Sequence, residues 1–360
     1  MKREPPPIAM PGRIVHVVGR VTDEVFSFLG PALQALARNG HAQAVVMLDE
    51  QRYRHHVARL HESAGLLMTP SRRNPFKQWE VMHQACCSAL GGARLHAVHL
   101  HGVLPALVGA QAVRAMQIDV PVFFSPHGSR LMGTLGSLGT LVHALLSTTR
   151  RAAIVNVPQE SNAFEDWQSS ELVESPVGEV FFAVARKEAR HPLVVTGGRS
   201  QGVRSAERVS QLAVLLSGED LHISFNWIGT VDEISRLRLN AANVGVLDVT
   251  GDAECAYRLA AGWVYLAPGA TRGFPLFLVE AMAAGLPCVA LDCVQHREVI
   301  RDGETGYLCA TGREMIERIA TLIDDPALRL RLGKAGRAAA KARFDETLFG
   351  AKLLAAYALP

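Results

Sequence analysis

The segment from Gly273 to Cys309 contains the residues whose types and spacing most clearly suggest chemistry. Gly273 to Leu276 (GFPL) is a turn that opens a helix, so free backbone N–H groups face whatever binds there. Through these groups and its dipole, a helix N-terminus is a ready site for an anion. Glu280 follows about two turns into the helix, and Gly285-Leu286-Pro287 ends it before an apolar strand. The alternative is that nothing binds there and that these residues form one ordinary βαβ unit.

Three histidines lie at the ends of two predicted strands. His99 and His101 alternate along HLHG, so their side chains point to the same face of the sheet. A metal held by this pair would need a third ligand that the sequence does not identify, so we expect no metal. His127 ends the strand in VFFSPHG, where it is either a capped histidine of the core or a group that contacts a ligand.

The pentapeptide GRSQG fits G-x-S-x-G, the nucleophile elbow of α/β-hydrolases, and it follows a predicted strand. Ser200 would be the nucleophile, and Asp248 or Asp292 and then His296 follow in the hydrolase order of serine, acid and histidine. Against this alternative, the elbow requires a helix that begins almost at the serine, whereas the helix here is predicted to start after Ser205. One hydrolase domain also leaves the preceding strands and helices unexplained.

Residues 50–77 carry more basic than acidic side chains. The stretch is either a solvated helix face with a loop, or a dock for an anionic lipid surface or a lipid-linked acceptor. The second interpretation would place the protein peripherally on the inner face of the membrane. The basic residues are Arg52, Arg54, His55, His56, Arg59, His61, Arg72, Arg73 and Lys77, against Glu50 and Glu62.

The composition is typical of a globular cytoplasmic protein with two domains. With 360 residues, 49% apolar and 20% charged, the chain is too long for one small core and too apolar to be disordered. The net charge of +3 is too balanced for a nucleic-acid binder. We find no signal segment and no apolar run long enough to span a membrane. The spacing of Cys86, Cys87, Cys255, Cys288, Cys293 and Cys309 contains no CxxC pair, so we expect reduced thiols.

Strands that alternate with amphipathic helices predict an α/β fold with two parallel sheets. In the first series we expect a helix over Phe26–Arg38 and strands over Ile14–Val18, Ala44–Leu48, Leu95–Leu100 and Pro121–Ser125. In the second series we expect helices over Ala206–Leu216 and Ile234–Asn240 and strands over Leu193–Thr196, His222–Trp227, Val244–Leu247, Trp263–Leu266 and Cys288–Leu291.

The charged segment Ser175–Pro192, with a proline near each end, is predicted to connect two domains. The first domain would comprise residues 1–180, with the helix of residues 345–360 packing back on it. The second would comprise residues 186–344. Two doubly wound sheets that face each other would form a ligand cleft at the carboxyl ends of their strands.

The order of these motifs resembles that of GT-B fold retaining glycosyltransferases of the family 4 type (glycosyl transferases group 1). In that family a Glu-x7-Glu motif, GF, EAMA, GLP and a later E-V-I-x-D-G-x-x-G-x-L follow in this order, and here the later motif reads EVIRDGETGYL from Glu298 to Leu308. HLHG and SPHG are similar to strand ends in the first domain of family members, and VTGGRSQGVR resembles the family's G-R-x4-K loop. The resemblance covers nearly the whole chain and implies two Rossmann-like domains that face each other across a cleft.

The resemblance also implies a role for each matching residue. Arg199 and Arg204, the second in place of the family's Lys, would clamp the nucleotide diphosphate together with the amides of Gly273 to Leu276. Glu280 would accept hydrogen bonds from the ribose hydroxyls, and His127 would position the sugar. Because the two arginines supply the charge, the resemblance implies no metal and no other cofactor.

The implied activity is transfer of a hexose-type sugar, with retention, from a nucleotide-sugar donor to a glycan or glycolipid acceptor, in cell-surface polysaccharide biosynthesis. Two positions depart from the family pattern. Arg272 stands where the family's first Glu contacts the donor sugar, so either the donor carries an anion such as a uronic acid or sugar binding is weakened. The donor-side loop that starts at Gly19 has a single glycine where relatives are often Gly-Gly rich. The alternative is therefore a GT-B pseudoenzyme that serves as a binding or scaffold subunit.

Overall fold

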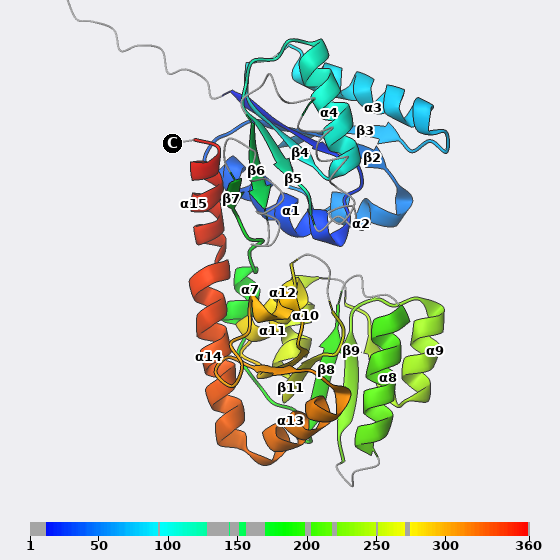
Figure 1. The fold of residues 1–360 in the computed structure, drawn as a ribbon, viewed down its shortest axis with the longest axis vertical. Coiled ribbons are helices and arrows are strands. Elements are labelled where there is room, and N and C mark those ends of the chain that lie inside the picture. The colour runs from blue at the N-terminus through cyan, green and yellow to red at the C-terminus, as the bar shows by residue number, and fades with distance from the viewer. Residues whose placement is uncertain are drawn as a thin grey trace, which may run out of the picture. The chain divides into compact units, whose positions relative to one another are not determined.

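Short runs of aliphatic and β-branched residues form the strands of two parallel sheets, one in each of two units (Figure 1). The first unit comprises Met1–Glu174 and Gly350–Pro360, and the second comprises Ser175–Phe349. The computed structural model describes residues 12–92, 94–127, 144, 151–155, 170–198, 203–217, 222–249, 251–270 and 274–358.

In the first sheet the strand order reverses direction between β1 and β4: successive strands are added on one side of β1 up to β3, and on its other side from β4 onward. From edge to edge the strands are β3 (Ala64–Pro70), β2 (Gln43–Asp49), β1 (Arg13–Val18), β4 (Leu95–His101), β5 (Val122–Ser125), β6 (Arg151–Val155) and β7 (Ser170–Leu172). Every pairing between them is parallel. In an open parallel sheet, ligands bind outside the carboxyl ends of the strands where the order reverses, so this unit has one such point at β1 and β4.

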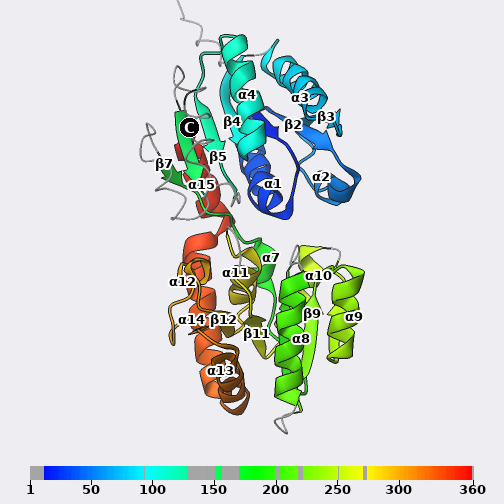
Figure 2. The same ribbon diagram turned by 45° about the vertical axis from the view of Figure 1, so that its right-hand side comes forward.

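Helices cover both faces of the first sheet, so the strands are apolar on both sides. The helices are α1 (Asp23–Arg38), the 3-10 turn η1 (Gln51–Tyr53), α2 (Arg54–Val57), α3 (Pro75–Leu90) and α4 (Val103–Ala115). Val15 and Val17 pack with residues of α3 and α4, while Val18 packs with α1 on the other face. Figure 2 shows α3 and α4 side by side.

The second sheet repeats the same order with six strands. They are β10 (Val244–Leu247), β9 (Ser224–Ile228), β8 (Leu193–Gly197), β11 (Val264–Ala267), β12 (Cys288–Leu291) and β13 (Tyr307–Cys309), all parallel, with the reversal between β8 and β11. Its helices are α7 (Glu179–Ala183), α8 (Val203–Ser217), α9 (Glu233–Ala241), α10 (Asp252–Ala260), α11 (Leu276–Ala283), α12 (Val294–Arg297), α13 (Gly312–Asp324) and α14 (Pro326–Phe344). Helix α15 (Glu346–Ala356) runs from the second unit into the first.

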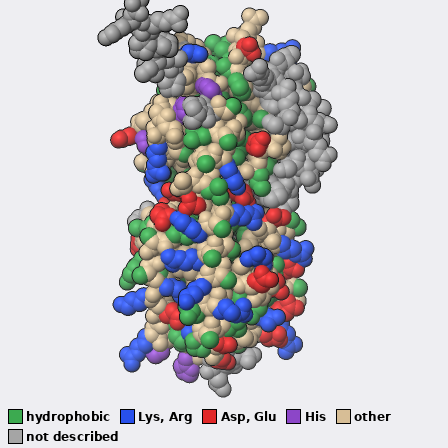
Figure 3. All heavy atoms as spheres, turned by 90° about the vertical axis from the view of Figure 1, so that its left-hand side faces the viewer, with side chains coloured by type: hydrophobic (Ala, Val, Ile, Leu, Met, Phe, Trp, Pro, Cys, Tyr) green, Lys and Arg blue, Asp and Glu red, His purple; other side chains and the backbone are tan. Residues whose placement is uncertain are grey.

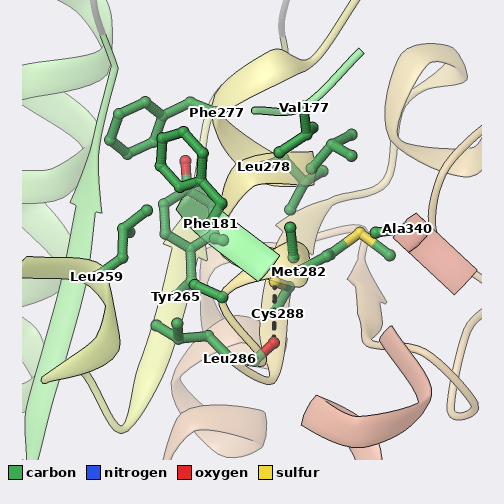
Figure 4. Packing of buried hydrophobic residues seen from close by; sticks show 14 of the residues in the cluster. Val177, Phe181, Leu259, Tyr265, Phe277, Leu278, Met282, Leu286, Cys288 and Ala340 are labelled. Atoms are coloured by element: carbon green, nitrogen blue, oxygen red, sulfur yellow. Dashed lines mark hydrogen bonds between the residues drawn. The ribbon is translucent and has the colours of Figure 1, made fainter. Parts of the chain in front are cut away.

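The core of the second unit joins α7, α11 and α14 to the sheet. Figure 4 shows Phe181 of α7, Tyr265 of β11 and Met282 of α11 packed together with Ala340 of α14. On the surface, Figure 3 shows basic and acidic side chains interspersed over this unit. Lys341 of α14, for example, lies 2.6 Å from carboxylate oxygens of both Glu179 and Asp345.

Most predicted elements are present, with helix starts set by their capping residues. Helix α1 begins at Asp23, three residues before the predicted start, because the Thr22 hydroxyl accepts a hydrogen bond from the Val25 amide. Helix α8 begins at Val203 and not after Ser205, so one objection to a hydrolase elbow is wrong. Residues 50–77 contain the edge strand β3, which was not predicted, but their basic side chains lie on helices and loops and none lies on β3.

Strands β3, β6, β7 and β13 and helix α3 are among the elements missing from the prediction. The N-cap signal of α3 is readable, since Asn74 accepts from the Phe76 and Lys77 amides and Pro75 follows it directly.

The segment Ser175–Pro192 is part of the second unit and not a linker. It contains α7, and the Arg186 guanidinium donates to the carbonyls of Gly285 (2.7 Å) and Gly262 (3.0 Å). All six cysteines are free thiols, as predicted. None of the described helices is long and apolar enough to cross a membrane.

Candidate functional site

The two loops at the order reversal of the second sheet contain most of the predicted site residues. The loop after β8 leads into α8, and the loop after β11 leads into α11. Arg199, Arg272 and Gly273 belong to these loops but lie outside the described residues. Arg204 is the second residue of α8, and its side chain is likewise outside the described part.

Described neighbours bring these two loops together. Arg208 of α8 donates a hydrogen bond to the carbonyl of Pro268, directly after β11 (3.1 Å). A Cβ on Gly269 would lie only 3.3 Å from the Ser205 hydroxyl. The first turn of α8 therefore lies against the loop after β11, although about 60 residues separate them in the sequence.

At the end of β8 the backbone segments approach so closely that only glycine fits. Gly197 has a φ of +143°, and a Cβ there would lie 2.0 Å from the carbonyl oxygen of Ile228 in β9. Gly229 has a φ of +115°, and its Cβ would lie 2.7 Å from the Gly198 carbonyl oxygen. No side chain fits at either position, so the backbone itself forms the floor where the loop of Arg199 begins.

Helix α11 presents its first turn and a buried carboxylate. The helix begins at Leu276 after Pro275, which offers no side-chain cap and has no N–H. The Leu276 amide donates to the Phe274 carbonyl at 2.9 Å, so it is not one of the free amides predicted for this turn. Phe274, half-buried, packs edge-on against Phe344 at 5.2 Å. Glu280 is only 3% exposed. Burying a carboxylate is costly, which makes Glu280 a candidate for polar recognition and not a solvated helix residue.

The first unit holds the other predicted residues at the carboxyl edge of its sheet. Gly19 follows β1, its carbonyl accepts from the Leu48 amide, and a Cβ there would lie 3.0 Å from Cγ of Pro105 at the start of α4. His127 follows β5 and is buried, with a φ of +53° that non-glycine residues rarely adopt. Burial lowers the pKa of His127 to about 3, so its ring is neutral.

The histidine pair on β4 has the neighbour that the sequence analysis did not find. His16 of β1 is in register with His99, and the imidazoles of His16, His99 and His101 offer nitrogens within 4.8 Å of one another. By spacing alone these three rings could hold a metal ion. His16 is visible in IVHVV, but only the pairing of β1 with β4 shows that its ring lies beside His99 and His101.

Two further contacts tie the cluster to the rest of the unit. His101 Nδ1 lies 2.8 Å from His127 Nε2, which makes His127 a member of the same group. The second contact is between His99 and the hydroxyl of Tyr357, a residue that follows α15.

The described residues do not form the acid and histidine of a hydrolase. Arg236 binds the Asp248 carboxylate at 2.8 Å, and Arg297 binds that of Asp292 at 2.5 Å. His296 donates from Nδ1 to the Leu291 carbonyl at 2.7 Å, where a triad histidine would donate to a carboxylate. Ser200 lies outside the described residues.

Comparison with known proteins agrees with the arrangement of the second unit. Residues 186–325 match the family model of glycosyl transferases group 1. Phosphatidyl-myo-inositol mannosyltransferase of Mycobacterium leprae is 34% identical over 137 residues, which cover 36% of each chain. The GtfA subunit of the UDP-N-acetylglucosamine–peptide N-acetylglucosaminyltransferase of Streptococcus pneumoniae is 26% identical over 178 residues, 48% of this chain and 35% of that one. This chain therefore matches about a third of the length of these relatives.

Solved structures match over nearly the whole chain. Sucrose-phosphate synthase of Thermosynechococcus elongatus superimposes with a TM-score of 0.74 at 18% identity, covering 96% of this chain and 98% of that one. HepE of Anabaena, solved in complex with UDP-glucose, superimposes with a TM-score of 0.76 at 13% identity, covering 96% and 99%. The chain therefore has the GT-B fold, and its residues 186–325 are similar to glycosyl transferases group 1.

Proposed function

We propose that the chain is a glycosyltransferase that moves a sugar, with retention, from a nucleotide-sugar donor to a glycan or lipid-linked acceptor. The match of residues 186–325 to glycosyl transferases group 1 carries this proposal, because that region includes both loops at the order reversal of the second sheet. UDP-glucose in the HepE complex and the lipid in the name of the mycobacterial relative support the classes of donor and acceptor.

The proposed chemistry is stabilisation of the leaving diphosphate. Arg199 in the loop after β8 and Arg204 in the first turn of α8 supply positive charge, and the amides at the start of α11 add hydrogen bonds. Glu280 accepts from the ribose hydroxyls, and His127 bonds to the transferred sugar. Two cations at the diphosphate can replace a metal in this role, so we propose transfer without a cofactor.

A binding screen followed by a transfer assay tests the proposal. Nucleotide sugars are screened by thermal shift, where a ligand at 100 times its Kd adds about 2.7 kcal/mol to the free energy of unfolding. Arg199→Ala and Arg204→Ala should each weaken nucleotide diphosphate binding about tenfold or more, since a charged hydrogen bond contributes roughly 1.5–3 kcal/mol. Arg313→Ala, at a side chain 90% exposed on α13, is the matched control. Equal affinities of the wild type and the three variants would show that Arg199 and Arg204 do not bind the diphosphate. Binding of a nucleotide sugar without transfer would favour a pseudoenzyme.

Arg272 provides a separate test of donor choice. Its guanidinium could hold a carboxylate on the donor in a bidentate fashion, so we propose a preference for acidic sugars such as uronic acids. Wild type should then favour uronic over neutral nucleotide sugars, and Arg272→Glu should reverse this preference. A wild type without preference and a variant with the same profile would contradict it.

We also propose that the loop before α3, together with the first turn of that helix, docks on an anionic lipid surface. The basic turn, defined as Arg72, Arg73, Phe76 and Lys77, is exposed, and Phe76 is 85% exposed. Other basic residues of the stretch are engaged within the unit: Arg54 pairs with Asp49, and Arg59 lies over the Phe26 ring. An exposed aromatic ring among cations is typical of membrane-surface binding.

Vesicle co-sedimentation tests this dock. Binding should require anionic lipid, and Lys77→Glu should weaken it by more than fivefold, since each basic residue contributes about 1 kcal/mol. Phe76→Ser should weaken it too, whereas Leu330→Ser, at an equally apolar exposed position of α14, should not. Equal binding to neutral vesicles would overturn the proposal.

A further inference from the structure

The hydrogen bonds of His99 leave neither of its ring nitrogens for a metal. Ser125 Oγ lies 2.6 Å from the Ile154 carbonyl oxygen, which can only accept, so the single hydroxyl proton of Ser125 goes there. Ser125 Oγ must then accept from His99 Nε2 at 2.9 Å, which makes His99 the Nε2–H tautomer. The other nitrogen, Nδ1, is a lone pair that accepts from the Tyr357 hydroxyl. A metal at this cluster would have to displace the Tyr357 hydroxyl from His99 or the His99 donor from Ser125.

The other three rings form a separate chain of hydrogen bonds. His16 Nδ1 lies 3.1 Å from His101 Nε2, and His101 Nδ1 lies 2.8 Å from His127 Nε2. The planes of the last two rings are only 12° apart, so an N–H of one can point in-plane at the lone pair of the other. All three rings are neutral because burial lowers their pKa values, so each ring has one N–H and one lone pair.

One proton per ring allows only two arrangements of the whole chain. Either every proton points from His16 toward His127, or every proton points the other way. His16 Nε2 decides between them, because it is buried and no hydrogen-bond partner for it exists among the described residues. Buried N–H groups without a partner are rarer in proteins than buried acceptors without one, so His16 Nε2 is the bare nitrogen. The protons therefore point toward His127.

We propose that His16 and His101 are positioning residues that hold His127 in the Nδ1–H tautomer, in which Nδ1 can donate a hydrogen bond and cannot accept one. A role of this tautomer toward the transferred sugar rests on the proposed function, whereas the tautomer does not. The ring of Phe28 on α1 covers the group, with its centroid 5.6 Å from that of His127 and 5.8 Å from that of His99. Phe28 is fully buried, so water does not reach the chain of rings from this side.

The backbone at His127 supports a positioned and not a merely structural ring. A φ of +53° costs roughly 1–3 kcal/mol for a residue other than glycine, and the surrounding structure must maintain it. The conformation turns the chain sharply at the carboxyl end of β5, where ligands bind in such sheets.

Nitrogen NMR on the full chain with ¹⁵N-labelled histidine tests the tautomer directly. His127→Gln identifies the His127 signals in the wild-type spectrum. We expect Nδ1 of His127 to be protonated and Nε2 to be bare in the wild type. His16→Leu should produce a mixed or reversed tautomer at His127. His16→Asn, which can place an amide N–H near the position of Nδ1, should restore the wild-type signals.

His41→Leu is the matched control, because His41 is a buried histidine of the same unit outside the cluster, and it should change nothing at His127. A His127 protonated on Nε2 in the wild type overturns the proposal even if both His16 variants fail to fold. An unchanged His127 tautomer in folded His16→Leu overturns it as well.

Metal binding and kinetics complete the test. After dialysis against zinc, the wild type should hold no stoichiometric metal; one zinc per chain that is lost in His16→Leu but kept in His41→Leu would establish a metal site instead. With transfer detected, His16→Leu should lower kcat about tenfold with little change in KM for the acceptor, and His16→Asn should restore most of it. Absence of any transfer would count against the proposed function, while the NMR result would still decide the tautomer.

Discussion

At the scale of single residues, Glu280 gives the sharpest test of nucleotide recognition. A buried carboxylate can accept both ribose hydroxyls, and charged hydrogen bonds contribute roughly 1.5–3 kcal/mol. Glu280→Gln should therefore lower affinity for ribonucleotides by tenfold or more and reduce discrimination against the 2′-deoxy analogue, measured by calorimetry. Glu317→Gln, at an exposed position of α13, is the control. A variant that keeps the full ribose preference would make Glu280 a structural residue.

The buried histidines predict a dependence of stability on pH. Burial lowers the pKa of His16 and of His127 to about 3, and the pKa values of His99 and His101 also fall well below 6.5. The unfolded chain binds protons near pH 6.5 while the folded protein does not, so the free energy of unfolding is highest above pH 7 and falls as the pH drops below about 6.5. At pH 5.5 each histidine should lower it by roughly 1.4 kcal/mol.

The free energy of unfolding is measured by urea unfolding at pH 7.5, 6.5 and 5.5, with hydrogen exchange of the β4 amides as the probe. His16→Leu should show a shallower decline, because it has one fewer buried imidazole to protonate. A free energy of unfolding that stays constant over this range would show that the rings are charged or solvated in the folded state.

At the scale of elements, the end of β8 makes a prediction about the loop of Arg199. Gly197→Ala places a Cβ 2.0 Å from the Ile228 carbonyl oxygen, so the backbone must move, at a cost of about 3 kcal/mol or more. Gly303→Ala is the matched control, because Gly303 has a φ of +72° but no atom lies within 4 Å of the added Cβ. This variant should lose only about 1–2 kcal/mol of unfolding free energy. Thermal unfolding of the two variants compares these costs. Equal losses would mean that conformation and not contact sets the cost at Gly197.

Elements also show how far the sequence could predict this molecule. The α/β class and the helices with clear caps follow from local patterns, such as Asn74-Pro75 before α3. Strand order does not, because adjacency in a sheet joins residues far apart in the chain. His16 illustrates the difference: IVHVV predicts a buried strand, but only the pairing of β1 with β4 places its ring beside His99 and His101. The site on the second unit was found through a resemblance of motifs, and spacing alone would have left it as one βαβ unit.

At the scale of the whole molecule, residues 350–358 complete the first unit after the entire second unit has intervened. Tyr357 is 1% exposed, its hydroxyl bonds to His99, and its carbonyl accepts from His96 at 3.2 Å. Tyr357→Phe keeps the ring packing but leaves His99 Nδ1 buried without its donor, so the first unit should lose about 1–3 kcal/mol of unfolding free energy. Hydrogen exchange should show faster opening in β4 and unchanged protection in β11. Equal loss in both units would mean that the two do not respond separately.

The return of the chain to the first unit has a consequence for synthesis on the ribosome. The strands of the first sheet all emerge before Glu174, yet the tyrosine that closes their histidine face emerges only after the 175 residues from Ser175 to Phe349. At 5–20 residues per second this interval lasts roughly 9–35 s. The first unit thus spends that time without the Tyr357 hydroxyl that bonds to His99, while the second unit is contiguous and can finish folding as it emerges. A nascent chain of this protein completes its later half first and its earlier half last.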